Sequence, residues 1–327
     1  MEKKGPLEIS ELKSKTPGTQ VWGKFLILEK VQRKTRDGKS ILHLKLGDPS
    51  GDIDAVVWEN CSIEGGLEPG TVIGCLGDVG RFSNRLQLTA RKIKHLPEED
   101  VYHYLKSPPL DLDELIRDFE SLQAKILDPF MVILLERIFT SPLREAFFQA
   151  PAAKRFHHNY GGGLLEHTVA VARLCLQSGS FYPDMNRDLL LTGALLHDIG
   201  KLCEYDMNIT PEFTPQGRLL GHIMMGAEKI SGNISALRLE GHDFPAELEW
   251  MLKHMILSHH GSLEFGSPVI PQFPEALLLH MMDNLDAKMH VFRSKIDDDV
   301  HLDPFFTAYD GLLGQSYFKY KYPGKTE

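Results

Sequence analysis

Residues 189–201 of the chain read LLLTGALLHDIGK. A mostly apolar run of eight residues comes first and predicts a buried helix, and the polar pair His197-Asp198 follows it directly. A histidine and a carboxylate buried at the end of such a helix are costly unless both side chains have partners. A divalent metal ion is a suitable partner, because imidazole nitrogens and carboxylate oxygens both bind Mn²⁺, Fe²⁺ and Zn²⁺. This stretch therefore predicts a metal site inside a helical domain.

Gly200 and Lys201, which follow the His197-Asp198 pair, extend this interpretation. Gly200 suits the left-handed backbone conformation that ends many helices, so we expect the helix to stop there. Lys201 would lie one turn further on, where its ammonium could reach a phosphate bound to the metal. Asp198 and Lys201 are therefore the candidate catalytic residues.

Histidine is concentrated in the second half of the chain, where 11 of the 15 lie between His157 and His290. It is the commonest metal ligand and the usual proton carrier near neutral pH. A single buried histidine is more often a hydrogen-bonded core residue, and a single aspartate can be a salt-bridged or capping group. Five apolar helical segments that each carry such residues at one place form a much more specific pattern. The residues concerned are His167, His197, Asp198, His222, His259, His260, Asp283 and Asp286.

In the N-terminal part, apolar and polar residues alternate in short runs that are typical of β-strands. Strands are predicted at residues 21–33, 41–46, 53–58, 71–76 and 85–93, with turns near Asp37-Gly38, at 47–52 and at 77–84. The longer connection between the third and fourth strands favours a five-stranded Greek-key barrel of OB type at residues 1–97, with an SH3-like barrel or an open sandwich as alternatives. Residues 98–150 are expected to be a helical connector and residues 151–327 an all-α domain. The predicted fold class is thus multidomain α and β.

Composition places the chain among soluble globular proteins of two or three domains, since 42% of its 327 residues are apolar and 25% are charged. The N-terminus has no secretory signal and no run approaches the ~18 apolar residues of a membrane span, so we expect no membrane association. The four cysteines form no C-x-x-C pair and no disulfide framework, which favours a reducing cytoplasm. They are Cys61, Cys75, Cys175 and Cys203.

The net charge of −9 is unevenly distributed. Residues 1–97 carry 16 Lys and Arg against 12 Asp and Glu, a balance of +4, and the remainder carries −13. A mildly basic module attached to an acidic one can bind nucleic acid. The candidate nucleic-acid-binding residues are Lys30, Arg33, Lys34, Arg36 and Lys39. The candidate stacking aromatics are Trp22, Phe25, Trp58 and Phe82, although strand aromatics are at least as often buried.

The pattern His…His-Asp…His…His-His…Asp, with a lysine three residues after the first aspartate, resembles the HD-domain superfamily of metal-dependent phosphohydrolases. This resemblance implies one metal held by His167, His197, Asp198 and Asp283. It allows a second metal through the additional ligands His222, His259 and His260. The superfamily usually uses the first Asp of a D-x-x-D segment, which favours Asp283 over Asp286.

A closer resemblance comes from the domain order and from residues 151–168, PAAKRFHHNYGGGLLEHT. Both are similar to the YhaM family of 3′→5′ exoribonucleases, over roughly residues 10–320. The resemblance implies Mn²⁺-dependent removal of nucleotides from the 3′ end of single-stranded RNA, with DNA as a further candidate substrate. His157, His158 and Tyr160 precede the first ligand and are candidates to line the substrate entrance, with packing between helices as the alternative. Lys201 and Asp286 complete the candidate substrate-binding residues.

The chemistry agrees with that resemblance, because two metals about 3.5–4 Å apart can hold a phosphodiester and activate a water for attack on phosphorus. Two other functions stay open at this point. One is a nucleotide or cyclic-dinucleotide phosphohydrolase, against which the absence of a G-Y-P motif speaks. The other is a non-catalytic nucleic-acid-binding regulator, against which the intact ligand set speaks. A homo-oligomer would present several barrels to one strand.

Overall fold

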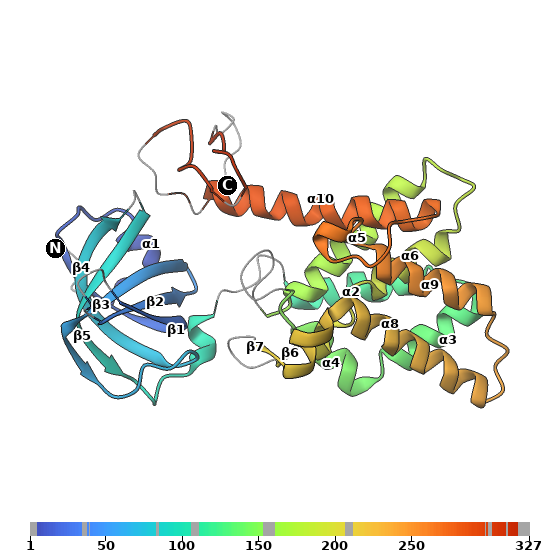
Figure 1. Ribbon diagram of the computed structural model, residues 1–327, viewed down its shortest axis with the longest axis horizontal. Helices are drawn as coiled ribbons and strands as arrows, with labels where there is room; N and C mark the ends of the chain where they lie inside the picture. The colour runs from blue at the N-terminus through green and yellow to red at the C-terminus, as the bar shows by residue number, and fades with distance from the viewer. Residues whose placement is uncertain are drawn as a thin grey trace. The chain divides into compact units, whose positions relative to one another are not determined.

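A computed structural model of the protein describes residues 5–34, 38, 40–82, 85–105, 111–152, 161–206, 212–297, 299, 303–311 and 313–319. The chain divides into two compact units. Figure 1 labels the helices and strands of each unit. One unit contains residues 1–107 together with 292–327, and the other contains residues 108–291. The predicted domain boundaries after residues 97 and 150 do not coincide with this division, whose boundaries lie after residues 107 and 291.

Five strands form a closed barrel in the first unit. They are β1 (Gln20–Lys34), β2 (Ser40–Asp48), β3 (Gly51–Glu64), β4 (Val72–Phe82) and β5 (Arg85–His95). The strands pair in the order β1-β2-β3-β5-β4, and β4 returns to β1. Strands β3 and β5 run parallel and the other pairs are antiparallel. This closed Greek-key order is the one expected for an OB-type barrel and excludes an open sandwich.

The barrel core is filled by apolar side chains that alternate along the strands. Leu44 and Leu46 on β2 and Leu88 on β5 are buried in it. Phe25 on β1 is only 1% exposed, so its predicted role as a stacking platform is wrong: it lies on the inward face of its strand. The short helix α1 (Ile9–Leu12) adds apolar side chains to the same core, and the backbone N–H of its first residue, Ile9, donates to a carboxylate oxygen on β2 at 2.7 Å.

Strand β4 continues through residues that the sequence predicts as a turn. Its pairing with β5 shifts by one residue between Leu76 and Gly77, which marks a β-bulge. A Cβ on Gly77 would lie 2.6 Å from the carbonyl oxygen of Thr89 on β5. The glycine is therefore explained by a close approach between strands, and the prediction of a turn beginning there is wrong. Most of the predicted turn around Asp37 lies outside the described residues.

The second unit is mainly helical. Its helices are α2 (Leu112–Gln123), α3 (Pro129–Ile138), α4 (Ser141–Gln149), α5 (Gly163–Gly179), α6 (Arg187–Leu196), α7 (Lys201–Glu204), α8 (Pro215–Leu239), α9 (Ala246–Ser258) and the larger part of α10 (Pro274–Asp297). Between α7 and α8 the two-residue strands β6 (Tyr205–Asp206) and β7 (Glu212–Phe213) pair, a small departure from the all-α prediction. No helix in the described part of the chain is long and apolar enough to cross a membrane.

Helices α2, α3 and α4 share their core with the helices that carry the candidate site. Phe119 of α2 is completely buried and meets Phe139 and Phe148 edge to face. These rings belong to one continuous core with Leu164 of α5 and Leu191 of α6. Helices α2 to α4 of the segment predicted as a connector are therefore part of the helical unit, because their apolar faces need α5 and α6 to be buried.

Replacement of Phe119 by alanine tests this shared core. We expect Phe119→Ala to lower the free energy of unfolding of the helical unit by about 3–5 kcal/mol, because it leaves a cavity among aromatic rings. Urea unfolding of the full chain, followed by far-UV circular dichroism, measures the change. Leu127→Ala is the control: its side chain is 81% exposed, so its effect should stay within about 0.5 kcal/mol. Equal, small effects of both variants would contradict the shared core.

Candidate metal centre

The predicted site residues come from separate helices, and two of them cap the helix that carries them. His197 is the C-cap residue of α6, and residues 189–196 of that helix are all buried, so the pair His197-Asp198 lies inside the unit with 0% and 2% exposure. His259 likewise caps α9. The other residues come from α5 (His167), α8 (His222) and α10 (Asp283 and Asp286), and His260 follows α9.

Four of these side chains form a first group. The Nε2 atom of His167 lies 3.1 Å from Oδ1 of Asp283 and 3.2 Å from Nε2 of His197. Oδ2 of Asp198 lies 3.4 Å from Nε2 of His197 and 3.6 Å from Nε2 of His167. Ligands about 2.1 Å from one shared ion lie about 3.0 Å apart in an octahedral site and about 3.4 Å apart in a tetrahedral one. The first group therefore has the spacing of ligands around one divalent ion.

The second group consists of His222, His259 and His260, whose nearest ring nitrogens all lie within 4.8 Å of one another. The carboxylate of Asp198 joins it to the first group. Oδ1 of Asp198 lies 3.5 Å from Nε2 of His222 and 3.7 Å from Nε2 of His259, whereas Oδ2 faces the first group. Asp198 thus lies between the two groups and presents one oxygen to each.

Backbone carbonyls orient three of the five imidazole rings. Nδ1 of His197 donates to the carbonyl oxygen of Ala194 at 2.8 Å. In the same way Nδ1 of His259 donates to Ile256 and Nδ1 of His260 donates to Phe265, both at 2.7 Å. Because a carbonyl only accepts, each Nδ1 carries a hydrogen, and Nε2 of each ring faces another partner. This is the tautomer that a ring uses when Nε2 binds a metal.

Several buried polar atoms of the site make no hydrogen bond with any residue that the structure describes. They are Oδ1 of Asp198 and the Nε2 atoms of His222 and His259. Buried polar atoms normally have partners, so three such atoms facing one another need an explanation. A cation between them would satisfy all three. The donors are imidazole nitrogens and carboxylate oxygens, a set that suits ions such as Mn²⁺, Fe²⁺ and Zn²⁺. The residues present therefore fit divalent metals.

The histidines of the site are in contrasting electrostatic environments. Burial, reinforced by the neighbouring His260, holds the pKa of His259 well below its usual range, so that ring is neutral. Burial also lowers the pKa of His260. For His167 burial alone would lower the pKa, but hydrogen bonds to Asp283 and Asp286 outweigh it and raise the pKa to about 9. The strongest attraction for positive charge therefore lies at His167, beside the carboxylates.

Both carboxylates of the first group are ionised despite burial. Burial would raise the pKa of Asp198, but the charges of Lys201 and His197 hold it well below its usual range. Asp283 is lowered in the same way by its hydrogen bond to His167. Lys201 is itself buried, and its Nζ donates to Oδ2 of Asp198 at 2.6 Å. Its ammonium thus forms an ion pair with the Asp198 carboxylate.

Gly200 is not in the left-handed conformation that we expected. Its φ and ψ are −66° and −20°, which is right-handed. A Cβ there would lie 2.0 Å from the carbonyl oxygen of His222 and 2.7 Å from the backbone nitrogen of Gly226. The glycine therefore lets α8 pack backbone to backbone against the His197-Asp198 turn. The sequence signal was present in the repeated glycines of α8 (Gly217, Gly221 and Gly226).

Glu204, at the end of α7, was missed by the sequence analysis. Its carboxylate is buried, and Oε1 accepts the backbone N–H of His222 at 3.0 Å and lies 3.2 Å from Nδ1 of the same residue. Burial would raise the pKa of Glu204, but these contacts with His222 lower it. A glutamate at a helix end is too common to be a signal by itself. The predicted entrance residues His157, His158 and Tyr160 lie outside the described part of the chain.

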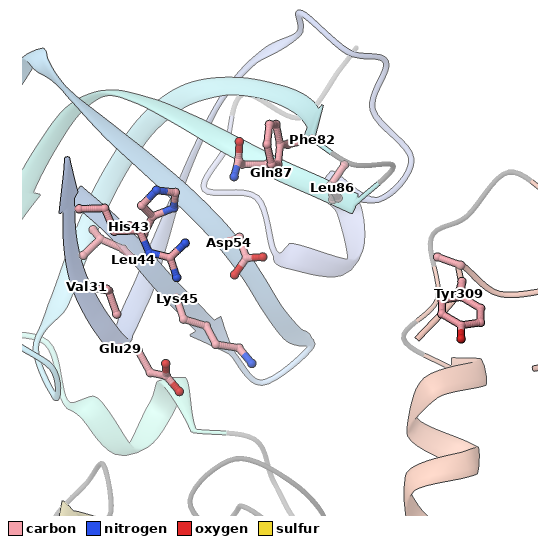
Figure 2. A pocket seen from close by; sticks show the side chains of 12 residues that line it. Glu29, Val31, His43, Leu44, Lys45, Asp54, Phe82, Leu86, Gln87 and Tyr309 are labelled. Atoms are coloured by element: carbon pink, nitrogen blue, oxygen red, sulfur yellow. The ribbon is translucent and has the colours of Figure 1, made fainter. Parts of the chain in front are cut away.

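The outer face of the barrel carries the other predicted surface. Arg33 of β1 and Lys45 of β2 line a pocket there with the aromatic side chain of Phe82, which is 69% exposed. Figure 2 shows His43, Lys45 and Phe82 in this pocket, together with the acidic Glu29 and Asp54. Trp22 and Trp58 are partly exposed elsewhere on the barrel, at 37% and 40%.

The predicted basic residues do not all share that face. Lys30 and Arg33 are three residues apart on β1, so their side chains point to opposite sides of the strand. The ammonium of Lys30 pairs with Glu68 at 2.6 Å. Lys34 alternates with Arg33, and Arg36 and Lys39 lie outside the described residues.

Comparison with known proteins agrees with both halves of this description. Residues 164–288 match the HD domain, and residues 29–96 match the OB-fold nucleic acid binding domain. The sequence is 34% identical to the 3′-5′ exoribonuclease YhaM of Oceanobacillus iheyensis, over 85% of this chain and 87% of that protein. The chain belongs to the YhaM family. The YhaM proteins of Geobacillus sp. (strain WCH70) and Bacillus subtilis (strain 168) are also 34% identical, over 92% and 84% of this chain and 92% and 87% of their own lengths.

Membership of the YhaM family confirms the predicted resemblance. The two domain matches confirm the predicted order of an OB-type barrel followed by an HD domain. The HD match contains every predicted metal ligand, from His167 to Asp283.

Alanine at Gly200 tests the close approach that builds the site. We expect Gly200→Ala to lower the free energy of unfolding by about 1–3 kcal/mol, because its methyl group would collide with the backbone of α8. It should also weaken Mn²⁺ binding in a calorimetric titration, since His222 would be displaced.

The matched control is Gly232→Ala on α8, the helix that Gly200 contacts, where a Cβ has nothing within 4 Å. Better helix propensity should stabilise that variant by up to about 1 kcal/mol. A Gly200→Ala protein as stable as the parent, with unchanged Mn²⁺ affinity, would show that this contact is not essential.

Proposed function

We propose that the chain is a metal-dependent 3′→5′ exoribonuclease and that its histidine–aspartate centre holds two divalent metal ions. The observation that carries this proposal is the position of Asp198: one carboxylate between two histidine groups, facing buried nitrogens that have no partner in the described structure. The name of the YhaM relatives, 3′-5′ exoribonuclease, supports the reaction and its direction.

The ligand sets follow from the distances. The first ion would be held by His167, His197, Asp198 and Asp283. The second would be held by His222, His259 and His260, with Asp198 shared. When bound, such a pair of ions polarises a phosphodiester and lowers the pKa of the water that attacks phosphorus. Mn²⁺ is the proposed native metal because the resemblance to the YhaM family implies it, and the nitrogen and oxygen donors fit it as they fit Fe²⁺ and Zn²⁺.

The residues of the chain have distinct parts in this function. Asp198 ties the two ligand groups together, so it is the residue on which both sites depend. Lys201 touches that carboxylate at 2.6 Å and is buried, which supports a positioning role through Asp198. Its contact with a substrate phosphate, and the entrance formed by His157, His158 and Tyr160, stay predictions.

Single-stranded RNA is the proposed substrate, with DNA as the alternative polymer. The outer face of the barrel supports this, because Arg33 offers positive charge beside the exposed ring of Phe82, whereas Lys45 already pairs with Asp52 at 2.7 Å. Single strands are bound by this combination of backbone charge and base stacking. Assembly into a homo-oligomer stays a prediction. The cysteines, all within the described ranges, are free, which supports a reducing compartment such as the cytoplasm.

A 5′-labelled single-stranded RNA incubated with the protein and Mn²⁺ tests the activity. We expect a ladder that shortens from the 3′ end, and Asp198→Asn should lower the rate at least about 100-fold, since both sites lose charge. RNA binding, measured by fluorescence anisotropy without turnover, should persist in the variant. Asp243→Asn removes an exposed carboxylate of the same unit and serves as the control.

Two outcomes would contradict the proposal. Turnover of mononucleotides or cyclic dinucleotides without shortening of RNA would point to a nucleotide phosphohydrolase. Binding of RNA with no hydrolysis in any divalent metal would point to a non-catalytic regulator.

Substitutions on the barrel test the proposed RNA-binding face. Phe82→Ala should weaken RNA binding about 5- to 150-fold, the equivalent of about 1–3 kcal/mol for one stacked base. Arg33→Gln should weaken it and reduce its dependence on salt, because one phosphate contact is lost. Lys30→Gln is the charge-matched control, since Lys30 already pairs with Glu68 on the opposite side of β1. If Lys30→Gln and Arg33→Gln weaken binding equally, total charge rather than this face determines affinity.

A further inference from the structure

Two of the five histidines are oriented differently from the others. His197, His259 and His260 bond through Nδ1 to backbone carbonyls. His167 and His222 have a carboxylate at Nδ1 instead. Asp286 lies 2.7 Å from Nδ1 of His167, and Glu204 lies 3.2 Å from Nδ1 of His222. One such pair belongs to each of the two ligand groups.

Asp286 and Asp283 occupy opposite edges of the His167 ring. Nε2 faces Asp283 at 3.1 Å, whereas Nδ1 faces Asp286 at 2.7 Å. The two aspartates are three residues apart on α10, so both point from one helix face toward the same ring. An ion bound at Nε2 is therefore on the side of Asp283. Asp286 contacts the ring from behind, which argues against its predicted contact with substrate.

Glu204 holds His222 at two points. Its Oε1 accepts the backbone N–H of His222 at 3.0 Å as well as lying beside the ring nitrogen. The preceding Gly221 has φ 72° and ψ 158°, so α8 is interrupted there and the N–H of His222 is turned away from the helical pattern. The carboxylate thus fixes both the backbone kink and the ring that follows it.

A carboxylate at Nδ1 does more than a carbonyl does. It fixes the tautomer and orientation of the ring, as a carbonyl also does, and its negative charge makes Nε2 a stronger electron donor to a cation. Removing such a partner typically weakens metal affinity 10- to 100-fold, by analogy with other metal sites, so about that range is expected here.

We propose that Asp286 and Glu204 are positioning residues and that each acts on a different metal site. Asp286 sets the metal affinity of the first group through His167, and Glu204 sets that of the second group through His222. This inference rests on the two-metal centre proposed above. It assigns to two carboxylates the independent tuning of the two sites.

Mn²⁺ binding to the full-length protein, measured by calorimetry and equilibrium dialysis, tests the assignment. Asp286→Asn and Glu204→Gln keep the size of each side chain and one oxygen acceptor. Each variant should bind one ion as the parent does and the other about 10- to 100-fold more weakly. Glu240→Gln, which removes an exposed partner of Arg137 on the same unit, should bind both ions normally. Thermal unfolding of the metal-free proteins checks that the folds are equally stable.

A cross between variants assigns each carboxylate to its site. In a His259→Gln background, which disables the second group, Asp286→Asn should weaken the remaining site and Glu204→Gln should not. In a His167→Gln background the two effects should exchange. A purely structural role would instead lower stability and both affinities together in each background.

The possible results separate this inference from the proposed function. If the parent binds two Mn²⁺ and both variants bind them equally well, the positioning roles are wrong and the two-metal centre stands. If both variants weaken both sites equally, the assignment of each carboxylate to one metal site is wrong. If the parent binds no Mn²⁺, the proposed function and this inference are both overturned.

Discussion

The burial of one carboxylate, that of Asp198, is the constraint on which the helical unit depends. Its oxygens lie at the end of a fully buried helix segment, where an isolated charge would be prohibitively unstable. The surrounding unit therefore brings the ammonium of Lys201 to it at 2.6 Å and places ring nitrogens of histidines from three other helices 3.5–3.7 Å from its oxygens. Because these ring nitrogens face two different oxygens, the same arrangement also creates two adjoining sites that fit cations.

Close backbone packing makes this convergence possible. Gly200 has the carbonyl of His222 where a side chain would be, and Gly217 has the carbonyl of Glu204 in the same place. These contacts bring α8 against the His197-Asp198 turn and place Glu204 beside the ring of His222. A rigid arrangement of this kind holds ligands in position before any cation arrives, which reduces the reorganisation that binding would otherwise require.

Many elements of this protein were predictable from local patterns. Alternation identified the five strands, and helical spacing identified the longer helices, because burial on one face imposes a period on the sequence. The helical segment before residue 150 was misjudged as a connector, since periodicity reports that a face is buried but not against what. Gly77 was misjudged as part of a turn for a related reason: a glycine marks a special backbone requirement, which can be a turn or a close approach.

By itself the sequence determined the chemistry of the site: histidines and aspartates on apolar helices, where only partnered polar groups are stable. Tertiary structure alone decided how they are used. It placed Asp198 between two groups, set Asp283 and Asp286 on opposite edges of one ring, and recruited Glu204 from a position without a distinctive pattern. The reason is physical: the partner of each side chain comes from a segment distant in the chain, and only packing brings the two together.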